Sequence, residues 1–414
     1  MLILLTLVPR LVFCGFVIGF DRAPMGDERD YHHLAANLAE GDGYRLANDQ
    51  VTARRPPLYP VVLSGVYRVF GANPVWGRLL QVLLGGVIVW LVFLVSLKYF
   101  DRQTAWIAAL LVAVNPFLIF ISGYMFTENL YVIILLAALL VIPFPSTMMQ
   151  SWRRILLAGI LFGMGSLARP TALGVGIWIA AFGLLIGSGS VAKRAARGGA
   201  LVLVLVLTLI PWAARNQSVF GKWIFFTSHG GMTFYQGNNE AVLEYPQYHG
   251  GVAPLHMLPG HEELRSMPEV EKDKAARVLG RTFLREHKRS VPILMWRKFA
   301  RFWRFRSDVG ISGIKSGWWF SRESALGRLA SSLDVGFVYA VLMIPLFVIG
   351  LVLTRKNWRR NVHLYGLVLI HTSVALVFYG SIRMRIPIEP VIAMFAAATI
   401  SFVVTRVRAR TSTE

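Results

Sequence analysis

The sequence predicts an all-α polytopic membrane protein, and three observations support that prediction. The chain has 414 residues, of which 55% are hydrophobic and only 16% are charged. Its mean hydropathy is +0.54, a value typical of membrane proteins and not of soluble domains of this length. Its long apolar runs are separated by prolines, glycines and short basic loops, which is the pattern of successive membrane-spanning helices.

The first apolar run, residues 2–20, is expected to be a retained span and not a cleaved signal peptide. No basic residues precede it, Arg10 interrupts it, and no small-residue cleavage site follows. The residues before Cys14 also lack the small residue that a lipoprotein signal requires. Because Cys14 is the only cysteine, an internal disulfide is excluded and a cysteine metal cluster is not expected.

A polar stretch follows at residues 26–60, and it begins with a predicted amphipathic helix. One helix face would collect Asp27, Tyr31, Leu34 and Leu38. The helix is expected to end near Gly41 and Gly43. The simplest interpretation of its first residue is that Asp27 caps the helix; the alternative is that this acid belongs to a site.

The rest of the chain divides into apolar spans and one long polar section. Residues 56–70 predict a second short helix at the membrane interface, and residues 76–100 are long enough to span. Two hairpins are expected at 105–142, broken at 115–116 and 123–129, and at 155–186, broken at Arg169–Pro170. A further span is predicted at residues 199–212.

Residues 214–330 form the polar section, with a charged helix near 269–287 and an aromatic, basic helix at 291–305 that suits the headgroup layer. A span at 331–353 and a hairpin at 362–405, broken at 383–387, complete a count of about ten spans.

The net charge of +21 lies mostly in short loops between spans, so lipid headgroups are the expected counter-charge and nucleic acid is not an expected partner. These basic loops all fall on one side, which the positive-inside rule makes cytoplasmic. Both termini are then cytoplasmic, and the polar stretch and the polar section face the exterior. No internal repeat is evident, which counts against the inverted-repeat transporter folds.

Ionisable residues gather at the predicted outer ends of spans, where they usually serve a site or a partner. The set comprises Asp27, Glu28, Asp30, Arg54, Arg55, Glu128, Arg169, Arg215, Asn216, Arg383 and Arg385. Arg54 and Arg55 could instead anchor on phospholipid phosphates, and Glu128 could serve only to pair with a neighbouring arginine. The adjacent His32 and His33 cannot share a helix face and are not expected to bind a metal.

One outward acid beside several arginines suits sugar transfer from a lipid phosphate. The acceptor hydroxyl needs one base to take its proton. The leaving phosphate is a weak base that needs positive charge and no general acid, and guanidinium groups bind its oxygens in pairs. A glycosidase would instead need two carboxylates at a defined separation.

Several motifs resemble those of the GT-C superfamily of bacterial membrane glycosyltransferases, in particular relatives of lipid A aminoarabinose transferases and protein O-mannosyltransferases (glycosyltransferase family 39-like). The first is Asp27-Glu28-Arg29-Asp30-Tyr31, similar to a D-E-x-x-Y loop, and the second is Arg55-Pro56-Pro57-Leu58-Tyr59-Pro60. Weaker similarities in the same order are Thr127-Glu128-Asn129, Ala168-Arg169-Pro170, Pro211-Trp212 with Arg215-Asn216, Gly237-Asn238-Asn239 and Arg383-Met384-Arg385 with Pro387.

The resemblance implies an inverting transferase that uses a polyprenyl-phosphate sugar on the outer face of the bacterial inner membrane, without a metal or other cofactor. It implies a GT-C transmembrane module at residues 1–213 with a catalytic first outer loop at 21–75, a periplasmic or interfacial section at 214–330, and C-terminal transmembrane helices at 331–414. The large C-terminal soluble domain of bigger members is missing, so the acceptor stays open between lipid, glycan and protein.

The candidate site residues combine this resemblance with the gathering at the outer ends of spans: the resemblance implies that Asp27 is the catalytic acid, Arg55 the phosphate-binding basic residue and Glu128 the second acidic residue. The expected catalytic residues are Asp27 and Glu28. The expected donor phosphate-binding residues are Arg54, Arg55, Arg383 and Arg385. The expected substrate-binding residues are Asp30, Tyr31, Tyr59, Glu128, Arg169, Asn238 and Asn239. The alternative function is a transporter or flippase for a lipid or lipid-linked sugar, which would place its charges near the bilayer midplane; a non-enzymatic scaffold would leave the acid–arginine set unexplained.

Overall fold

The computed structural model describes residues 2–47, 49–145, 151–305 and 335–411. Within these ranges the chain is helical, and its only β pairing is an isolated bridge between Arg45 and Val51. The predicted all-α class is therefore confirmed. The start of the predicted span at 331–353 and the end of the polar section lie outside the described residues.

Up to residue 220, the described part of the chain contains ten α-helices. Their bounds are α1 Leu2–Val12, continued by a π-helical turn at Phe13–Ile18, α2 Asp27–Glu40, α3 Leu58–Phe70, α4 Pro74–Tyr99, α5 Arg102–Ala113, α6 Pro116–Ile121, α7 Glu128–Val141, α8 Trp152–Ala168, α9 Thr171–Ile186 and α10 Val191–Phe220. The predicted break at Arg169–Pro170 falls between α8 and α9, and those at Asn115–Pro116 and 123–129 lie at the starts of α6 and α7.

The second half holds the polar section and the last long helices. The α-helices are α11 Gly230–Gln236, α12 Ala241–Glu244, α13 His261–Ser266, α14 Glu269–Glu286, α15 Val291–Trp303, α17 Val335–Leu353, α18 Trp358–Val377, α19 Ile382–Arg385 and α20 Glu389–Thr411. Single 3₁₀ turns occur at Pro246–Tyr248, Leu255–Met257, Lys288–Ser290, Arg355–Asn357 and Ile386–Ile388. The charged and the aromatic, basic helices of the polar section lie where the sequence predicts them.

The chain is a membrane protein. In the described part of the chain, four helical segments are long and apolar enough to cross a bilayer: α4, α10, α17 and Ile382–Thr411. Shorter apolar helices at Leu2–Ile18, Leu58–Phe70, Glu128–Val141 and Thr171–Ile186 accompany them. The count of about ten spans stays a prediction. At about 1.5 Å per residue, each of these shorter helices is too short to cross a hydrocarbon layer of about 30 Å alone.

Close packing of α8 on α10 depends on glycine. A Cβ atom added to Gly163 would lie 2.5 Å from Cβ of Thr208 and 2.9 Å from the carbonyl oxygen of Leu205. Small residues allow such close approach of backbones, which is how membrane helices gain packing energy where lipid gives no hydrophobic drive. This pair joins the main core, which extends over the apolar helices.

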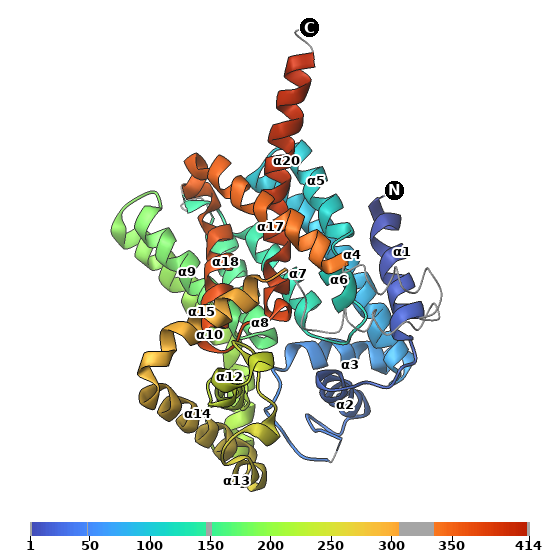
Figure 1. The fold of residues 1–414 in the computed structure, drawn as a ribbon, viewed down its shortest axis with the longest axis vertical. Coiled ribbons are helices and arrows are strands. Elements are labelled where there is room, and N and C mark those ends of the chain that lie inside the picture. The colour runs from blue at the N-terminus through green and yellow to red at the C-terminus, as the bar shows by residue number, and fades with distance from the viewer. Residues whose placement is uncertain (1, 48, 146–150, 306–334, 412–414) are drawn as a thin grey trace.

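The polar stretch and the polar section meet at one end of the molecule. Figure 1 shows α2 and α3 near the same end as α12, α13 and α14, while the C-terminal end of α20 lies at the opposite end. The polar section packs around a small core of its own, which contains Met232, Val242, Leu264, Ala276 and Phe283. The two segments that carry most of the polar candidates are therefore neighbours in space.

Candidate functional site

A cavity of about 410 Å³ lies where these segments meet the long helices. Its lining residues are Asp27, Tyr31, Arg54, Arg55, Pro56, Thr127, Ala168, Arg169, Pro170, Thr171, Leu173, Gly174, Thr227, His229, Gly230, Thr233, Ile370, Val374, Phe378, Tyr379, Arg383 and Met384. The charged groups come from α2, from the loop before α3 and from the breaks between helices. The apolar lining comes largely from α9 and the end of α18, so the cavity is amphipathic.

Asp27 lies at the centre of the charged lining. Its Oδ1 accepts a hydrogen bond of 2.5 Å from Nη2 of Arg55, and its Oδ2 accepts one of 2.6 Å from Nη1 of Arg383. No side-chain hydrogen bond caps α2, whose N-cap residue is Gly26. The capping interpretation of Asp27 is therefore wrong. Because 31% of the Asp27 side chain stays exposed, a ligand in the cavity can reach the carboxylate.

The pKa of Asp27 reflects two opposing effects. Burial raises the pKa of this carboxyl, but the positive charges of Arg383 and Arg55 and their hydrogen bonds more than offset burial and hold the pKa well below its usual range. The carboxylate is ionised at neutral pH. It is also a weak base for as long as both guanidinium groups hold it.

Glu128 connects Arg383 to a third arginine. Its Oε1 accepts from Nε of Arg383 at 2.6 Å and pairs with Nη1 of Arg169 at 2.8 Å. The predicted alternative role of Glu128, pairing with a neighbouring arginine, is thus present. Oε2 of this fully buried carboxylate has no hydrogen-bond partner among the described residues.

Asp30 completes the network on the other side. Its Oδ2 accepts from Nη2 of Arg55 at 2.9 Å and lies 3.6 Å from Nε of Arg54. Around the cavity, four guanidinium groups then face three carboxylates, which leaves one positive charge in excess. Arg54 is the least engaged of the four, with 40% of its side chain exposed. A singly charged anion would balance the site.

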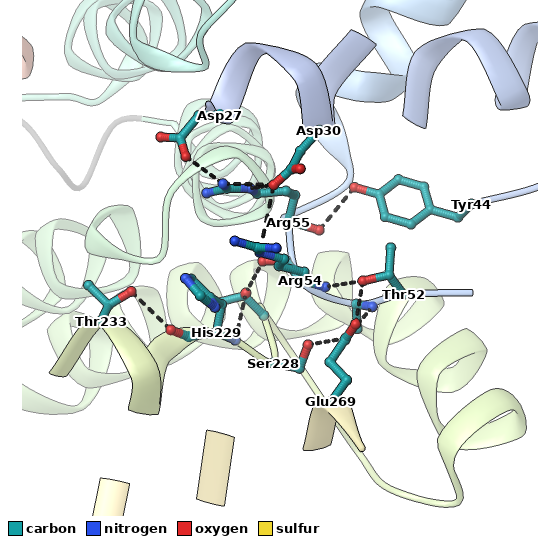
Figure 2. Close-up of polar contacts among 12 residues, drawn as sticks. Asp27, Asp30, Tyr44, Thr52, Arg54, Arg55, Ser228, His229, Thr233 and Glu269 are labelled. Carbon is teal, nitrogen blue, oxygen red and sulfur yellow. Dashed lines mark hydrogen bonds and ion pairs between the residues drawn. The ribbon is translucent and has the colours of Figure 1, made fainter. Parts of the chain in front are cut away.

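The loop that carries Arg54 and Arg55 is held from the polar section. Oε1 of Glu269, at the start of α14, accepts from the backbone N–H of Ala53 at 2.8 Å, and its Oε2 accepts from the hydroxyl of Thr52 at 2.6 Å (Figure 2). The hydroxyl oxygen of Thr52 in turn accepts from the backbone N–H of Arg54 at 2.9 Å.

Further contacts fix the same loop. Tyr44 donates its hydroxyl to the carbonyl oxygen of Arg55 at 2.9 Å, and Thr227 donates its hydroxyl to that of Arg54 at 2.5 Å. Arg215, at the end of α10, donates to the carbonyl oxygen of Thr52 at 2.8 Å. The positions of the two loop arginines therefore depend on backbone contacts from several separate parts of the chain.

Two of the expected site residues in the first loop, Glu28 and Tyr59, neither line the cavity nor pair with an arginine that lines it. Glu28 is fully buried, pairs with Arg22 and accepts from the backbone N–H of Met125 at 3.1 Å. One residue corresponds to about 100° of helix rotation, so Glu28 faces away from Asp27. Tyr59 is also fully buried, and its hydroxyl accepts from Nε2 of Gln81 at 2.7 Å. Both side chains make their polar contacts inside the protein and away from the cavity.

Arg385 lies outside the lining as well. It is buried and its Nε donates to Glu389 at 2.8 Å, while its Nη1 donates to the carbonyl oxygen of Arg304 at 3.0 Å. Arg383 and Arg385 belong to the single turn α19, and two residues correspond to about 200° of rotation. Only one of the two arginines can therefore face the cavity.

The asparagine pair after α11, Asn238 and Asn239, also lies outside the cavity lining. Oδ1 of Asn238 accepts from Nζ of Lys298 at 2.7 Å, and Nδ2 of Asn239 donates to the carbonyl oxygen of Tyr235 at 2.7 Å. Both asparagines are buried and hold the end of α11. The other expected residues either line the cavity or pair with an arginine that lines it: Asp27, Asp30, Tyr31, Arg54, Arg55, Glu128, Arg169 and Arg383.

Two titratable lining residues, His229 and Tyr379, have no counterpart among the sequence-based candidates. His229 lies just before α11, and Tyr379 lies in the break between α18 and α19. Neither belongs to a recognisable motif. The only sequence signal for them is their position near breaks that the apolar pattern already indicates.

The family comparison agrees with the position of this cavity. Residues 54–212 match the family model described as dolichyl-phosphate-mannose-protein mannosyltransferase. The matched segment begins at Arg54 and includes Arg55, Glu128 and Arg169. No curated protein is similar enough in sequence to count as a match.

Solved structures show the fold. The oligosaccharyltransferase AglB from Archaeoglobus fulgidus, in complex with an inhibitory peptide and a dolichol-phosphate, superposes with a TM-score of 0.55 at 13% identity, over 100% of this chain and 51% of AglB. An Archaeoglobus fulgidus oligosaccharyltransferase in the apo form gives a TM-score of 0.55 at 14% identity, over 99% of this chain and 51% of that protein. The chain therefore spans about half the length of the oligosaccharyltransferase that it matches.

ArnT from Cupriavidus metallidurans bound to undecaprenyl phosphate is a more distant match, with a TM-score of 0.47 and 13% identity over 96% of this chain and 77% of ArnT. The match of residues 54–212 and the fold shared with AglB agree with the predicted resemblance to GT-C membrane glycosyltransferases.

Proposed function

We propose that this chain, a GT-C membrane protein, transfers a sugar from a polyprenyl-phosphate donor to an acceptor hydroxyl in the cavity around Asp27. The observation that supports this function best is the amphipathic lining: an acid–arginine network with one excess positive charge adjoins an apolar wall between α9 and α18. A lipid phosphate has the matching pair of properties, an anion at the end of an apolar chain.

The donor phosphate would lie against Arg54, Arg55 and Arg383, since the planar fork of arginine binds two phosphate oxygens at once. The polyprenyl chain would run along Leu173, Ile370 and other apolar residues of the wall. The dolichol-phosphate in the matched AglB structure and the dolichyl-phosphate substrate in the name of the matched family support a donor of this class.

In the reaction, Asp27 would accept the proton of the acceptor hydroxyl as its oxygen attacks the anomeric carbon. The bond between that carbon and the phosphate oxygen breaks, and the phosphate leaves with its electron pair, stabilised by the arginines. Attack opposite the leaving group inverts the anomeric centre. The phosphate would also compete with Asp27 for Arg55 and Arg383, and each contact that Asp27 loses makes it a stronger base.

We place the cavity on the outer face of a bacterial inner membrane, with both termini in the cytoplasm. The basic short loops support this orientation. The acceptor belongs to the class of lipid, glycan or protein hydroxyls, as the resemblance implies.

The test is a comparison of the host cell's lipid-linked sugars and envelope glycans by mass spectrometry in a deletion strain that carries the wild-type gene, the Asp27→Asn gene or no gene. The proposal expects one glycan to lose a single sugar unit, and its polyprenyl-phosphate donor to accumulate, with Asp27→Asn and with no gene alike. A transporter would instead leave Asp27→Asn cells with wild-type glycans or would change the membrane leaflet of the donor without changing transfer in a detergent extract.

A further inference from the structure

Two neutral polar side-chain groups line the same cavity and form no hydrogen bond with another described residue. They are the imidazole of His229 and the hydroxyl of Tyr379. Within the described residues, neither side chain has a hydrogen-bond partner on its polar atoms, although both residues are partly buried. Polar groups at such depth are normally satisfied, so groups left open toward a cavity point to a ligand or to water.

His229 is held rigidly although its ring is free. Its backbone N–H donates to the hydroxyl oxygen of Thr227 at 3.1 Å, and its carbonyl oxygen accepts from the hydroxyl of Thr233 at 2.9 Å (Figure 2). Burial, with the positive charges of Arg54 and Arg55, lowers the pKa of His229 to about 3. The ring is therefore neutral at pH 7 and offers one donor and one acceptor, which suits a hydroxyl group and not a phosphate.

Tyr379 approaches the network from another element. It precedes α19, and the charges of Arg383, Arg169, Asp27 and Glu128 all influence the pKa of its hydroxyl group. Burial raises the pKa of this phenol, and the two arginines oppose that rise. The hydroxyl thus stays protonated and can both donate and accept a hydrogen bond.

We propose that His229 and Tyr379 form a recognition site for hydroxyl groups of the transferred sugar, while the arginines hold the phosphate. This proposal rests on the proposed function and adds to it a source of specificity for the transferred sugar. The two groups come from separate breaks in the chain, both contribute to the lining that contains Asp27, and both are uncharged. They therefore supply the kind of contact that a neutral sugar needs and that the arginine network does not.

The proposed site predicts that substitutions at His229 and Tyr379 change the affinities for two ligands differently. Bare undecaprenyl phosphate makes no contact with a sugar-binding pair, so its affinity should not depend on His229 or Tyr379. An undecaprenyl-phosphate sugar should lose about threefold to tenfold in affinity for each hydrogen bond removed.

The experiment measures binding to purified full-length protein in lipid nanodiscs by native mass spectrometry. The probes are undecaprenyl phosphate and undecaprenyl phosphate linked to glucose, galactose, mannose or arabinose. The variants are Tyr379→Phe, which removes only the hydroxyl group, His229→Leu, and His229→Gln, which keeps a hydrogen-bonding group. Tyr365→Phe is the matched control, because Tyr365 lies on α18 outside the cavity lining.

The proposal expects at least one sugar-loaded probe to bind wild-type protein more tightly than the bare phosphate. Tyr379→Phe and His229→Leu should remove that advantage, His229→Gln should restore part of it, and bare phosphate should bind all variants within about twofold of wild type. Equal loss for loaded and bare probes would show a structural role and overturn the proposal, as would an unchanged advantage. If no loaded probe binds better than bare phosphate, the sugar site is refuted while the phosphate site stands. If wild type does not bind undecaprenyl phosphate, the proposed function itself fails.

Discussion

Asp27 is held by the two guanidinium groups that the proposed mechanism also assigns to the donor phosphate. Both hydrogen bonds, to Arg55 and Arg383, are short and charge-assisted. Phosphate and carboxylate therefore compete for the same cations. An enzyme arranged in this way keeps its base weak until the donor is bound, which would limit wasteful reactions of the empty site.

The competition makes a specific prediction for Asp27→Asn. Asparagine has the same size but cannot accept the proton, so turnover should fall by at least about a hundredfold, the scale for loss of a general base. Because the variant removes a negative charge beside two arginines, its affinity for undecaprenyl phosphate should equal or exceed that of wild type. Turnover and affinity are measured on the same purified protein. A parallel loss of both would contradict the assignment of Asp27 as base.

The lowered pKa of Asp27 predicts an acid-dependent loss of stability. A carboxyl whose pKa is lower in the folded state stabilises that state above its unfolded pKa of about 3.9, and the stabilisation disappears as the pH falls toward the folded pKa. Wild type should therefore have a higher melting temperature than Asp27→Asn at pH 7, and the difference should shrink between about pH 5 and pH 3. A difference that stays constant over this range would contradict the account.

At the scale of elements, the start of α14 positions the loop that carries the site's arginines. Glu269 accepts hydrogen bonds from Thr52 and Ala53, and also from the hydroxyl of Ser228. A glutamine keeps the shape but turns one acceptor into a donor that faces N–H and O–H donors.

Glu269→Gln should consequently weaken binding of undecaprenyl phosphate by about threefold to tenfold, because Arg54 and Arg55 lose their fixed positions. The matched control is Glu271→Gln, two residues along the same helix, where an exposed ion pair with Lys222 has little energetic value. Equal affinities for the two variants, measured by titration in nanodiscs, would remove Glu269 from this role.

Some helices of this fold can be predicted from the sequence alone, whereas the contacts of the site cannot. The helix periodicity after Gly26 and the Arg169–Pro170 break predict α2, α8 and α9 because local pattern and proline geometry decide them. For the network of Asp27 with Arg55 and Arg383, the sequence predicted only that all three residues lie at the outer ends of spans. Their contacts could not be predicted, because Asp27 and Arg383 are 356 residues apart in the sequence.

Other candidate residues lie away from the cavity for geometric reasons. Arg385 shares a motif with Arg383 but points the other way round a single turn, and Asn238 accepts a hydrogen bond from Lys298. His229 and Tyr379 carry no motif; only the packing of α11 and α18 around the cavity reveals them. Sequence patterns identify which residues are unusual, whereas burial decides which of them a ligand can reach.

At the scale of the whole molecule, the proposal requires one orientation in the membrane. We expect Lys193 in the cytoplasm and Glu262 outside, from the basic loops and the position of the polar section. Both positions are exposed, so single cysteines there can be labelled in a Cys14→Ser background. An impermeant maleimide should label position 262 but not position 193 in spheroplasts. The reverse pattern would place the cavity on the cytoplasmic side and exclude an outer-face donor.

The claim that unites these scales is that the cavity binds a lipid phosphate through its arginines, and affinity tests it most directly. Purified wild-type protein in nanodiscs is titrated with undecaprenyl phosphate and with undecaprenol, and Arg55→Ala is titrated in parallel. We predict binding of the phosphate but not of the alcohol, and a loss of about tenfold to a hundredfold with Arg55→Ala, the scale for one charge-assisted contact. Equal binding of both lipids to wild type, or an unchanged affinity in Arg55→Ala, would contradict the account.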